Sequence, residues 1–138
     1  MYRSSAESNR SLVVVAFRGK LFANERMTGR RVWRTPIDGA NNDTPIELAI
    51  GENVVVACSL NTLSFVEYTT GRLLASVQRS ENGRPTMLID GEQLLVAGLG
   101  VVTCYTLGGQ LLWRDGFAGE GYGTVTMGFP GNVRQADG

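Results

Sequence analysis

The sequence predicts an all-β fold that is built from about three repeated four-stranded sheets. Three apolar segments begin alike, and successive segments start 41 and 40 residues apart, at Val13–Ala16, Val54–Ala57 and Leu94–Ala97. Glycine is abundant, with 18 residues, and charged residues make up only 19% of the chain. This composition favours short strands joined by tight turns. A strand-rich period of about 40 residues is the signature of β-propeller blades, whereas helical repeats would place apolar residues every 3.6 positions.

The first strand of each unit is almost continuously apolar, as expected for a strand that is covered on both faces. A short turn then leads into a second strand, predicted at residues 21–23, 63–66 and 101–105. The next turn ends in glycine, at Gly29, Gly71 and Gly109. Glycine suits these turns because it adopts a positive φ without strain. The third strands follow at residues 31–34, 73–76 and 111–114.

A fourth strand precedes the second and third units, at Pro45–Glu52 and Pro85–Glu92, and ends in Gly-Glu both times. Each full period therefore contains four short strands. We predict one propeller segment over residues 1–138, with blades at about 11–35, 44–78 and 85–115.

The two ends of the chain depart from the repeat. Residues 1–10 are polar and match no opening strand, so the first blade is predicted to lack one. After the third blade, Val125, Met127 and Phe129 alternate, which predicts an extra strand over about 123–129. Residues 133–138 show no pattern and are expected to be loose.

Propellers close with 4–8 blades, so three blades leave two open faces that need cover. We predict that the extra strand completes the first blade of a second copy, so that two copies form a six-bladed homodimeric ring. Two alternatives are a different propeller-completing protein and a longer propeller of which this chain is one piece.

The segment Leu21–Trp33 resembles the PQQ-like repeat of quinoprotein dehydrogenases and their non-catalytic relatives. It has leucine, six residues, Thr-Gly, three residues and tryptophan. Leu63–Leu74 matches, but Ala75 stands where the tryptophan would be, and Val101–Trp113 has Gly108-Gly109 in place of Thr-Gly. The resemblance covers about residues 11–115 and implies a β-propeller. In catalytic members it also implies a quinone, PQQ, and a calcium ion in the central funnel.

Side chains for catalysis are scarce. The chain has no histidine, the commonest general base, and no Gly-x-Ser-x-Gly motif. Cys58 and Cys104 lie apart in apolar strands, and we interpret them as buried thiols. A disulfide would need Cα atoms within roughly 7 Å. Glu52 and Glu92 occupy equivalent turns, which favours a structural role. We predict no catalytic, cofactor or metal site, hence a non-catalytic protein-interaction or scaffold module. The alternative is a fragment or subunit of a PQQ-dependent dehydrogenase, with PQQ and calcium.

We predict a partner surface at Phe117, Tyr122, Arg30 and Arg31. The two aromatic residues lie in a glycine-rich segment, as in many contact loops, and the arginines belong to a thin basic stripe that is otherwise a solvated edge. Thirteen basic residues balance thirteen acidic ones, so no nucleic acid partner is expected. No apolar segment approaches the roughly 18 residues of a membrane span, and residues 1–8 do not resemble a secretory signal. We therefore expect no membrane insertion and a soluble, cytoplasmic protein.

Overall fold

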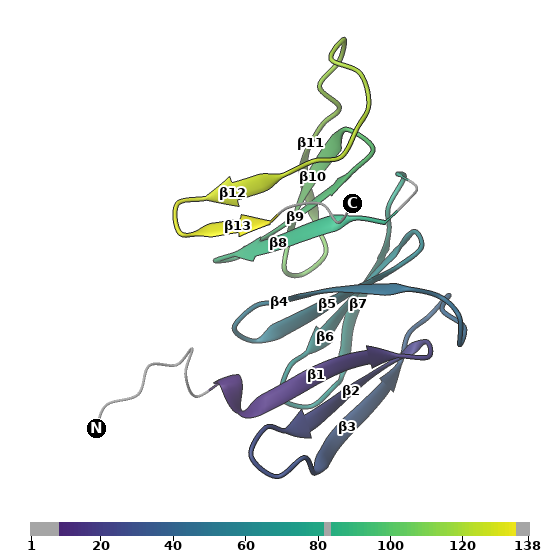
Figure 1. Cartoon of the computed structure of the whole chain (residues 1–138), viewed down its shortest axis with the longest axis vertical. Coiled ribbons are helices and arrows are strands. Elements are labelled where there is room, and N and C mark those ends of the chain that lie inside the picture. The colour runs from purple at the N-terminus through teal and green to yellow at the C-terminus, as the bar shows by residue number, and fades with distance from the viewer. Residues whose placement is uncertain (1–8, 82–83, 135–138) are drawn as a thin grey trace.

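The computed structural model describes residues 9–81 and 84–134 and is almost entirely β (Figure 1). A 3-10 turn at Asn9–Ser11 leads into the first strand. The strands are β1 (Leu12–Phe17), β2 (Lys20–Glu25), β3 (Arg31–Pro36), β4 (Ile46–Ile50), β5 (Val54–Ser59), β6 (Thr62–Glu67), β7 (Leu73–Gln78), β8 (Thr86–Asp90), β9 (Gln93–Gly98), β10 (Val101–Thr106), β11 (Leu111–Asp115), β12 (Met127–Phe129) and β13 (Asn132–Arg134).

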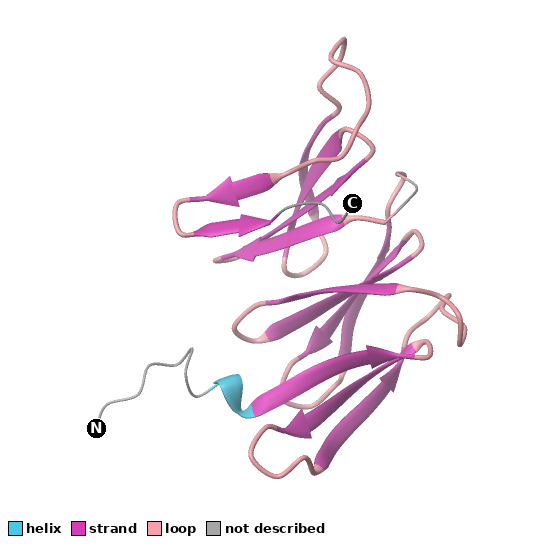
Figure 2. Ribbon diagram, viewed as in Figure 1, coloured by secondary structure: helices cyan, strands magenta, loops and turns pink. Residues whose placement is uncertain are grey.

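Neighbouring strands in the sequence pair antiparallel and form three sheets, which we call blades 1 to 3. Blade 1 has the order β1-β2-β3, blade 2 has β4-β5-β6-β7, and blade 3 has β8-β9-β10-β11. Strands β12 and β13 form a separate hairpin. Strand and loop make up nearly the whole molecule in Figure 2, which confirms the predicted all-β class.

The blades are stacked face to face, with blade 2 between blades 1 and 3 (Figure 1). Strand β4, at the inner edge of blade 2, lies against β8 and against β1. Side chains of β5 point alternately to the two neighbours, as in any strand. Val55 and Ala57 pack in the cluster with blade 1, whereas Val54, Val56 and Cys58 pack in the cluster with blade 3. Strand β5 is therefore buried along its whole length, as its apolar sequence predicts.

The turn between the second and third strands is built alike in blades 1 and 2. Gly29 and Gly71 both have φ of +76°, which explains the glycine that the sequence repeats there. In blade 1, the Thr28 hydroxyl donates to Glu25, and the Arg30 guanidinium lies 2.9 Å from the same carboxylate. Thr70, Glu67 and Arg72 repeat this arrangement in blade 2.

The sequence predicts a single strand over about 123–129, followed by a loose segment. The structure instead has two short strands in this part of the chain, β12 and β13. Strand β12 is short and turns back into β13, and both contact β8 of blade 3. The turn contains Gly131, which continues the 40-residue spacing of Gly51 and Gly91. The side-chain amide of Asn132 donates to the Ile89 carbonyl at 3.1 Å. The hairpin thus packs on β8 at the end of the stack, beyond the three sheets. Residues 1–8 and 135–138, on which part of the end expectations falls, lie outside the described residues.

Candidate functional site

Blades 1 and 2 are joined by a close contact between Trp33 and Gly71. Trp33 is only 7% exposed, and its indole N–H donates to the Tyr68 carbonyl at 2.8 Å. A Cβ atom on Gly71 would lie 2.5 Å from Cδ2 of the indole, so only glycine fits under the ring. The Thr35 hydroxyl donates to the Gly71 carbonyl at 2.6 Å. We call this arrangement the Trp–Gly joint.

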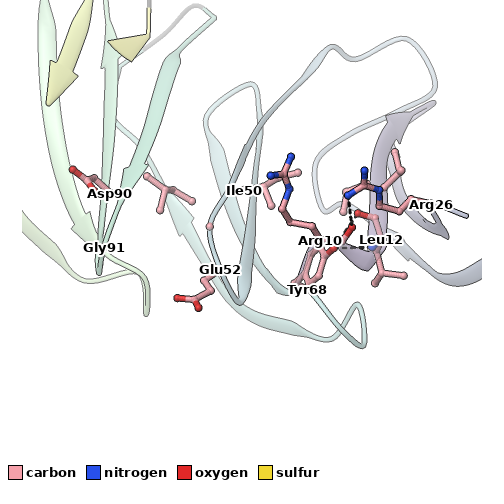
Figure 3. Close-up of a pocket in the computed structure, with 12 residues that line it drawn as sticks. Arg10, Leu12, Arg26, Ile50, Glu52, Tyr68, Asp90 and Gly91 are labelled. Atoms are coloured by element: carbon pink, nitrogen blue, oxygen red, sulfur yellow. Dashed lines mark hydrogen bonds between the residues drawn. The ribbon is translucent and has the colours of Figure 1, made fainter. Parts of the chain in front are cut away.

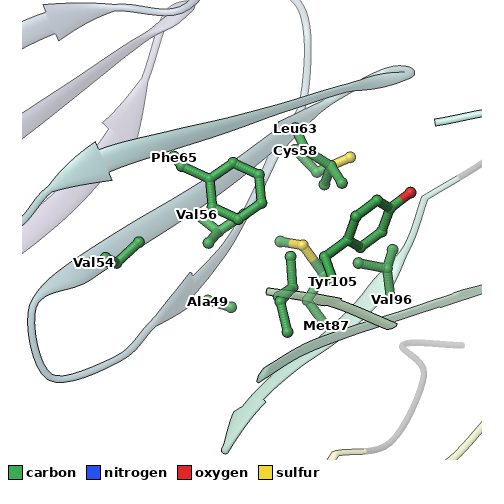
Figure 4. Packing of buried hydrophobic residues seen from close by; sticks show 10 residues of the cluster. Ala49, Val54, Val56, Cys58, Leu63, Phe65, Met87, Val96 and Tyr105 are labelled. Atoms are coloured by element: carbon green, nitrogen blue, oxygen red, sulfur yellow. The ribbon is translucent and has the colours of Figure 1, made fainter. Parts of the chain in front are cut away.

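Blades 2 and 3 are joined without a tryptophan, at the position where Ala75 replaces it. Gly109 takes the place of Gly71, and a Cβ there would lie 2.9 Å from Val77 and 3.6 Å from Phe65. Figure 4 shows the Phe65 and Tyr105 side chains in this cluster, with Met87 and Val96 nearby. Aromatic residues from β6 and β10 thus help to fill the joint between the second and third blades.

The surface of blade 3 that faces away from blade 2, here called the trailing face, carries half of a Trp–Gly joint. Trp113 pairs with Cys104 across β10 and β11, as Trp33 pairs with Ala23 across β2 and β3. Trp113 is nevertheless 45% exposed. Within the described residues, no glycine turn of a following blade covers its indole. Leu111 and Leu112 beside it on β11 are also exposed.

The surface of blade 1 that faces away from blade 2, here called the leading face, carries the other half. Leu12, Val14 and Ala16 pack toward blade 2, so the alternating residues Val13, Val15 and Phe17 point the other way and are exposed. Gly29 has the φ of Gly71, but a Cβ placed on it would meet nothing within 4 Å. The space that Trp33 fills above Gly71 is therefore open above Gly29.

A pocket of about 740 Å³ lies beside β1, where the inner strands of the three blades converge. Figure 3 shows Arg10, Leu12, Arg26 and Tyr68 on one side and Asp90 and Gly91 on the other, with Ile50 and Glu52 between them. The Tyr68 hydroxyl accepts a hydrogen bond from Leu12 N at 2.8 Å and donates one to Leu12 O at 2.9 Å. This hydroxyl occupies one end of the edge of β1 that pairs with no other strand among the described residues.

The lining of this pocket offers few ligands for a calcium ion. Calcium takes six to eight oxygen ligands, several of them carboxylates. This pocket has two carboxylates, Glu52 and Asp90, and two guanidinium groups, Arg10 and Arg26, which oppose a cation. Within residues 9–81 and 84–134, no three His, Cys, Asp or Glu side chains gather closely enough to hold a metal ion. None of the described helices is long and apolar enough to cross a bilayer.

The structure places the predicted partner residues at the two ends of the blade stack and does not bring them together. Arg30 forms the ion pair with Glu25, and the Arg31 guanidinium lies 4.8 Å from the centre of the Phe22 ring, both in blade 1. Phe117 and Tyr122 are exposed in the loop between β11 and β12, beyond blade 3. Sequence reasoning did not assign Trp113 and Gly29 to a partner surface, although the repeat pattern contains both.

The Arg30–Glu25 pair also sets the charge at the turn of blade 1. A hydrogen bond from Arg30, helped by one from Thr28, lowers the pKa of Glu25 to about 2.

Burial raises the pKa of the Cys58 thiol, against the smaller opposite influence of Arg79, and burial also raises the pKa of Cys104. Both thiols are free and buried, as the sequence predicts.

Several solved structures are similar to this chain. BamB from Moraxella catarrhalis shares 18% identity at a TM-score of 0.62, over 76% of this chain and 33% of BamB. The computationally designed Ika4 protein shares 17% sequence identity at a TM-score of 0.69, and the match covers 87% of this chain and 75% of Ika4. The quinohemoprotein alcohol dehydrogenase ADHIIG from Pseudomonas putida HK5 shares 16% sequence identity at a TM-score of 0.60. This match covers 83% of this chain and 19% of the dehydrogenase. The chain thus spans about a third of the BamB structure that it matches.

These likenesses bear on the fold alone. With the repeated sheets described above, they show that the protein is a partial β-propeller. No curated protein sequence matches the chain. The family model described as outer membrane protein assembly factor BamB matches residues 3–134, and the chain therefore belongs to this family of PQQ-repeat β-propeller proteins.

Proposed function

We propose that the protein is a non-catalytic β-propeller module that binds a protein partner through its open blade faces and serves as a scaffold. One observation carries the proposal: side chains that are buried between blades elsewhere in the stack are exposed at its ends. Val13 and Val15 occupy the positions of Val55 and Ala57, which are fully buried. Exposed apolar surface of this kind marks protein interaction sites. The matching family model is described as an assembly factor, and such a role suits a protein-binding scaffold.

The binding role is tested by capture from a native extract with two forms of the chain. The test form carries Val15→Ser and Trp113→Ser, one substitution on each open face, and the control form carries Leu60→Ser in the exposed β5–β6 turn. We expect proteins that bind the wild type and the control but not the test form. Equal capture by all three forms would contradict binding through the open faces.

A fragment or subunit of a PQQ-dependent dehydrogenase is the second candidate, favoured by the likeness to a quinohemoprotein alcohol dehydrogenase. The protein is incubated with PQQ and Ca²⁺, and thermal unfolding and alcohol-dependent dye reduction are measured. The scaffold proposal expects neither a rise in Tm nor dye reduction. Dye reduction above that of free PQQ would favour the dehydrogenase. A cytoplasmic location stays a prediction, and fractionation of the source cells tests it.

A further inference from the structure

We infer that the trailing face of one copy binds the leading face of a second copy, with Trp113 lying over Gly29 as Trp33 lies over Gly71. This inference deepens the proposed function and rests on it, because it names the partner of the open faces. The chain already contains one complete Trp–Gly joint between blades 1 and 2. The inferred interface is a second joint of the same construction, made from the two halves at its ends.

Strand register shows that the two halves match the complete joint position by position. Glu25 pairs with Leu12 in blade 1, as Glu67 pairs with Val54 in blade 2. Four residues after each glutamate come Gly29 and Gly71, both at φ of +76°. The backbone under the open space is therefore shaped like the backbone under Trp33. A Cβ built on Gly29 would meet no atom within 4 Å, so the space beside Gly29 is free for an indole. The indole would then lie against a glycine, as the Trp33 indole lies against Gly71.

The hydrogen bond of the joint also has a counterpart. Tyr68, whose carbonyl accepts from the Trp33 indole, directly follows Glu67. Arg26 directly follows Glu25 and thus holds the corresponding position in blade 1. In the inferred interface, the indole N–H of Trp113 donates to the Arg26 carbonyl of the second copy. A tryptophan at an interface needs such a partner for its N–H when it becomes buried.

The surrounding apolar side chains complete the interface. Val13 and Val15 on the leading face gain the cover that Val55 and Ala57 receive inside the stack. On the trailing face, the exposed indole of Trp113 loses its contact with water, as the indole of Trp33 does inside the stack. Buried aromatic residues that are ringed by aliphatic contacts are typical of the residues that dominate interface energetics.

A second copy is the occupant that these observations favour, because both halves of the joint lie on one chain and in one register. The interface is head-to-tail, and such interfaces form rings when the rotation closes. Two copies supply six complete or nearly complete blades, within the range of 4–8 that closes a propeller. The hairpin strand β12 of one copy reaches the position beside β1 of the other, where the described part of blade 1 has no innermost strand.

This placement assigns a role to β13. Within one chain, β13 pairs with β12 as β5 pairs with β4. In the ring, β1 of the second copy takes the same place beside β12. Strand β13 is only three residues long, whereas β1 has six. Because β12 itself has only three residues, the exchange keeps about the same number of main-chain hydrogen bonds, and the association of the two copies gains its free energy from the buried indole and valines.

The inference is tested by light scattering on a size-exclusion column over a range of concentrations of the full chain. We expect a dimer for the wild type and monomers for Trp113→Ala and Gly29→Asn. Asparagine tolerates positive φ better than other non-glycine residues, so the second variant keeps the turn while its side chain fills the open space. Each joint should weaken at least about tenfold, and because the ring contains the joint twice, the Kd should rise about 100-fold.

Matched controls are Leu60→Ala, an exposed apolar residue outside both faces, and Gly39→Asn, a glycine at φ of +78° in the connection between β3 and β4. Both should remain dimers. Mixing Trp113→Ala with Gly29→Asn supplies a further readout. The mixed pair contains one intact joint, since each variant retains the half that the other lacks, and one joint in which both halves are altered. In that second joint the asparagine side chain meets no indole, so the two costs do not add. The mixed pair should therefore dimerise more tightly than either variant alone.

A wild-type monomer at all concentrations would overturn the inference, as would a dimer that survives both face variants. Failure of the mixture to associate more tightly than the separate variants would also contradict a head-to-tail joint. None of these results bears on catalysis. The proposed non-catalytic function fails on a different measurement, the reduction of dye with PQQ and Ca²⁺, so the two can be distinguished.

Discussion

Gly29 and Gly71 have the same backbone conformation and the same neighbours in sequence, but different surroundings. Gly71→Ala adds a methyl group 2.5 Å from the Trp33 indole, whereas Gly29→Ala adds one in open space. In urea denaturation of dilute protein, we expect Gly29→Ala to lower the free energy of unfolding by about 1–2 kcal/mol, from backbone strain alone. Gly71→Ala should lower it by about 2–5 kcal/mol, because overpacking is added. Equal losses would contradict the Trp–Gly joint.

Glu25 offers a second measurement on a single side chain, by NMR titration of its carboxyl group. Its pKa is about 2, below that of the unfolded chain, so its pair with Arg30 stabilises the fold above the unfolded pKa. This contribution is lost as the pH falls toward 2. Arg30→Gln should return the pKa of Glu25 toward its ordinary value, whereas Arg72→Gln in blade 2 should not move it. Because the pair is exposed, Tm at pH 7 should change little.

At the scale of the strands, the period of about 40 residues predicted the order of the elements well. Continuous apolar segments predicted β5 as a strand covered on both faces, and its burial confirms this. The strand predicted over about 123–129 contains β12, but β13 was missed because few apolar residues mark it. The signal that could have found it is Gly131, at the same spacing as Gly51 and Gly91.

The candidate site was harder to predict than the strands. Trp33 and Trp113 are both followed by arginine in outer strands of equivalent blades, so the local sequence gives no reason to treat them differently. What distinguishes them is the presence or absence of a neighbouring blade over the indole. Burial of this kind depends on contacts between distant segments, and single-sequence patterns do not contain it. The number of repeats predicted two open faces that need cover, but the sequence did not identify Trp113 and Gly29 as the residues that are exposed there.

The burial of β5 and β10 predicts that both cysteines react slowly. In the native protein at pH 8, a thiol reagent such as DTNB should modify neither Cys58 nor Cys104 within minutes, and in denaturant it should modify both. Their pKa values are raised, so the reactive thiolate is scarce even where the reagent enters. Ser76→Cys on the exposed side of β7 is the control and should react at once. Rapid native reaction of two thiols would contradict the burial of these strands.

At the scale of the whole molecule, the two tryptophans report on the end faces. Trp33 is buried within the single chain, whereas Trp113 is 45% exposed there. We expect acrylamide to quench the fluorescence less as the protein concentration rises, because Trp113 becomes covered when two copies associate. Trp113→Phe leaves Trp33 as the sole tryptophan, and its weak quenching should not depend on concentration. Quenching of the wild type that is equally independent of concentration would contradict burial of Trp113 by a second copy.

The Tyr68 hydroxyl, which binds both main-chain groups of Leu12, has a consequence for how the protein survives storage. Until a second copy closes the ring, this edge of β1 has no partner among the described strands, and such an edge is a template on which other chains can add strands and grow fibres. The hydroxyl occupies the main-chain N–H and C=O of Leu12, the first such pair on the edge of β1, so a foreign strand cannot begin to pair there. Tyr68→Phe removes only this oxygen. A shorter lag time for fibril growth in this variant than in the wild type would show that one phenol hydroxyl protects the edge of β1.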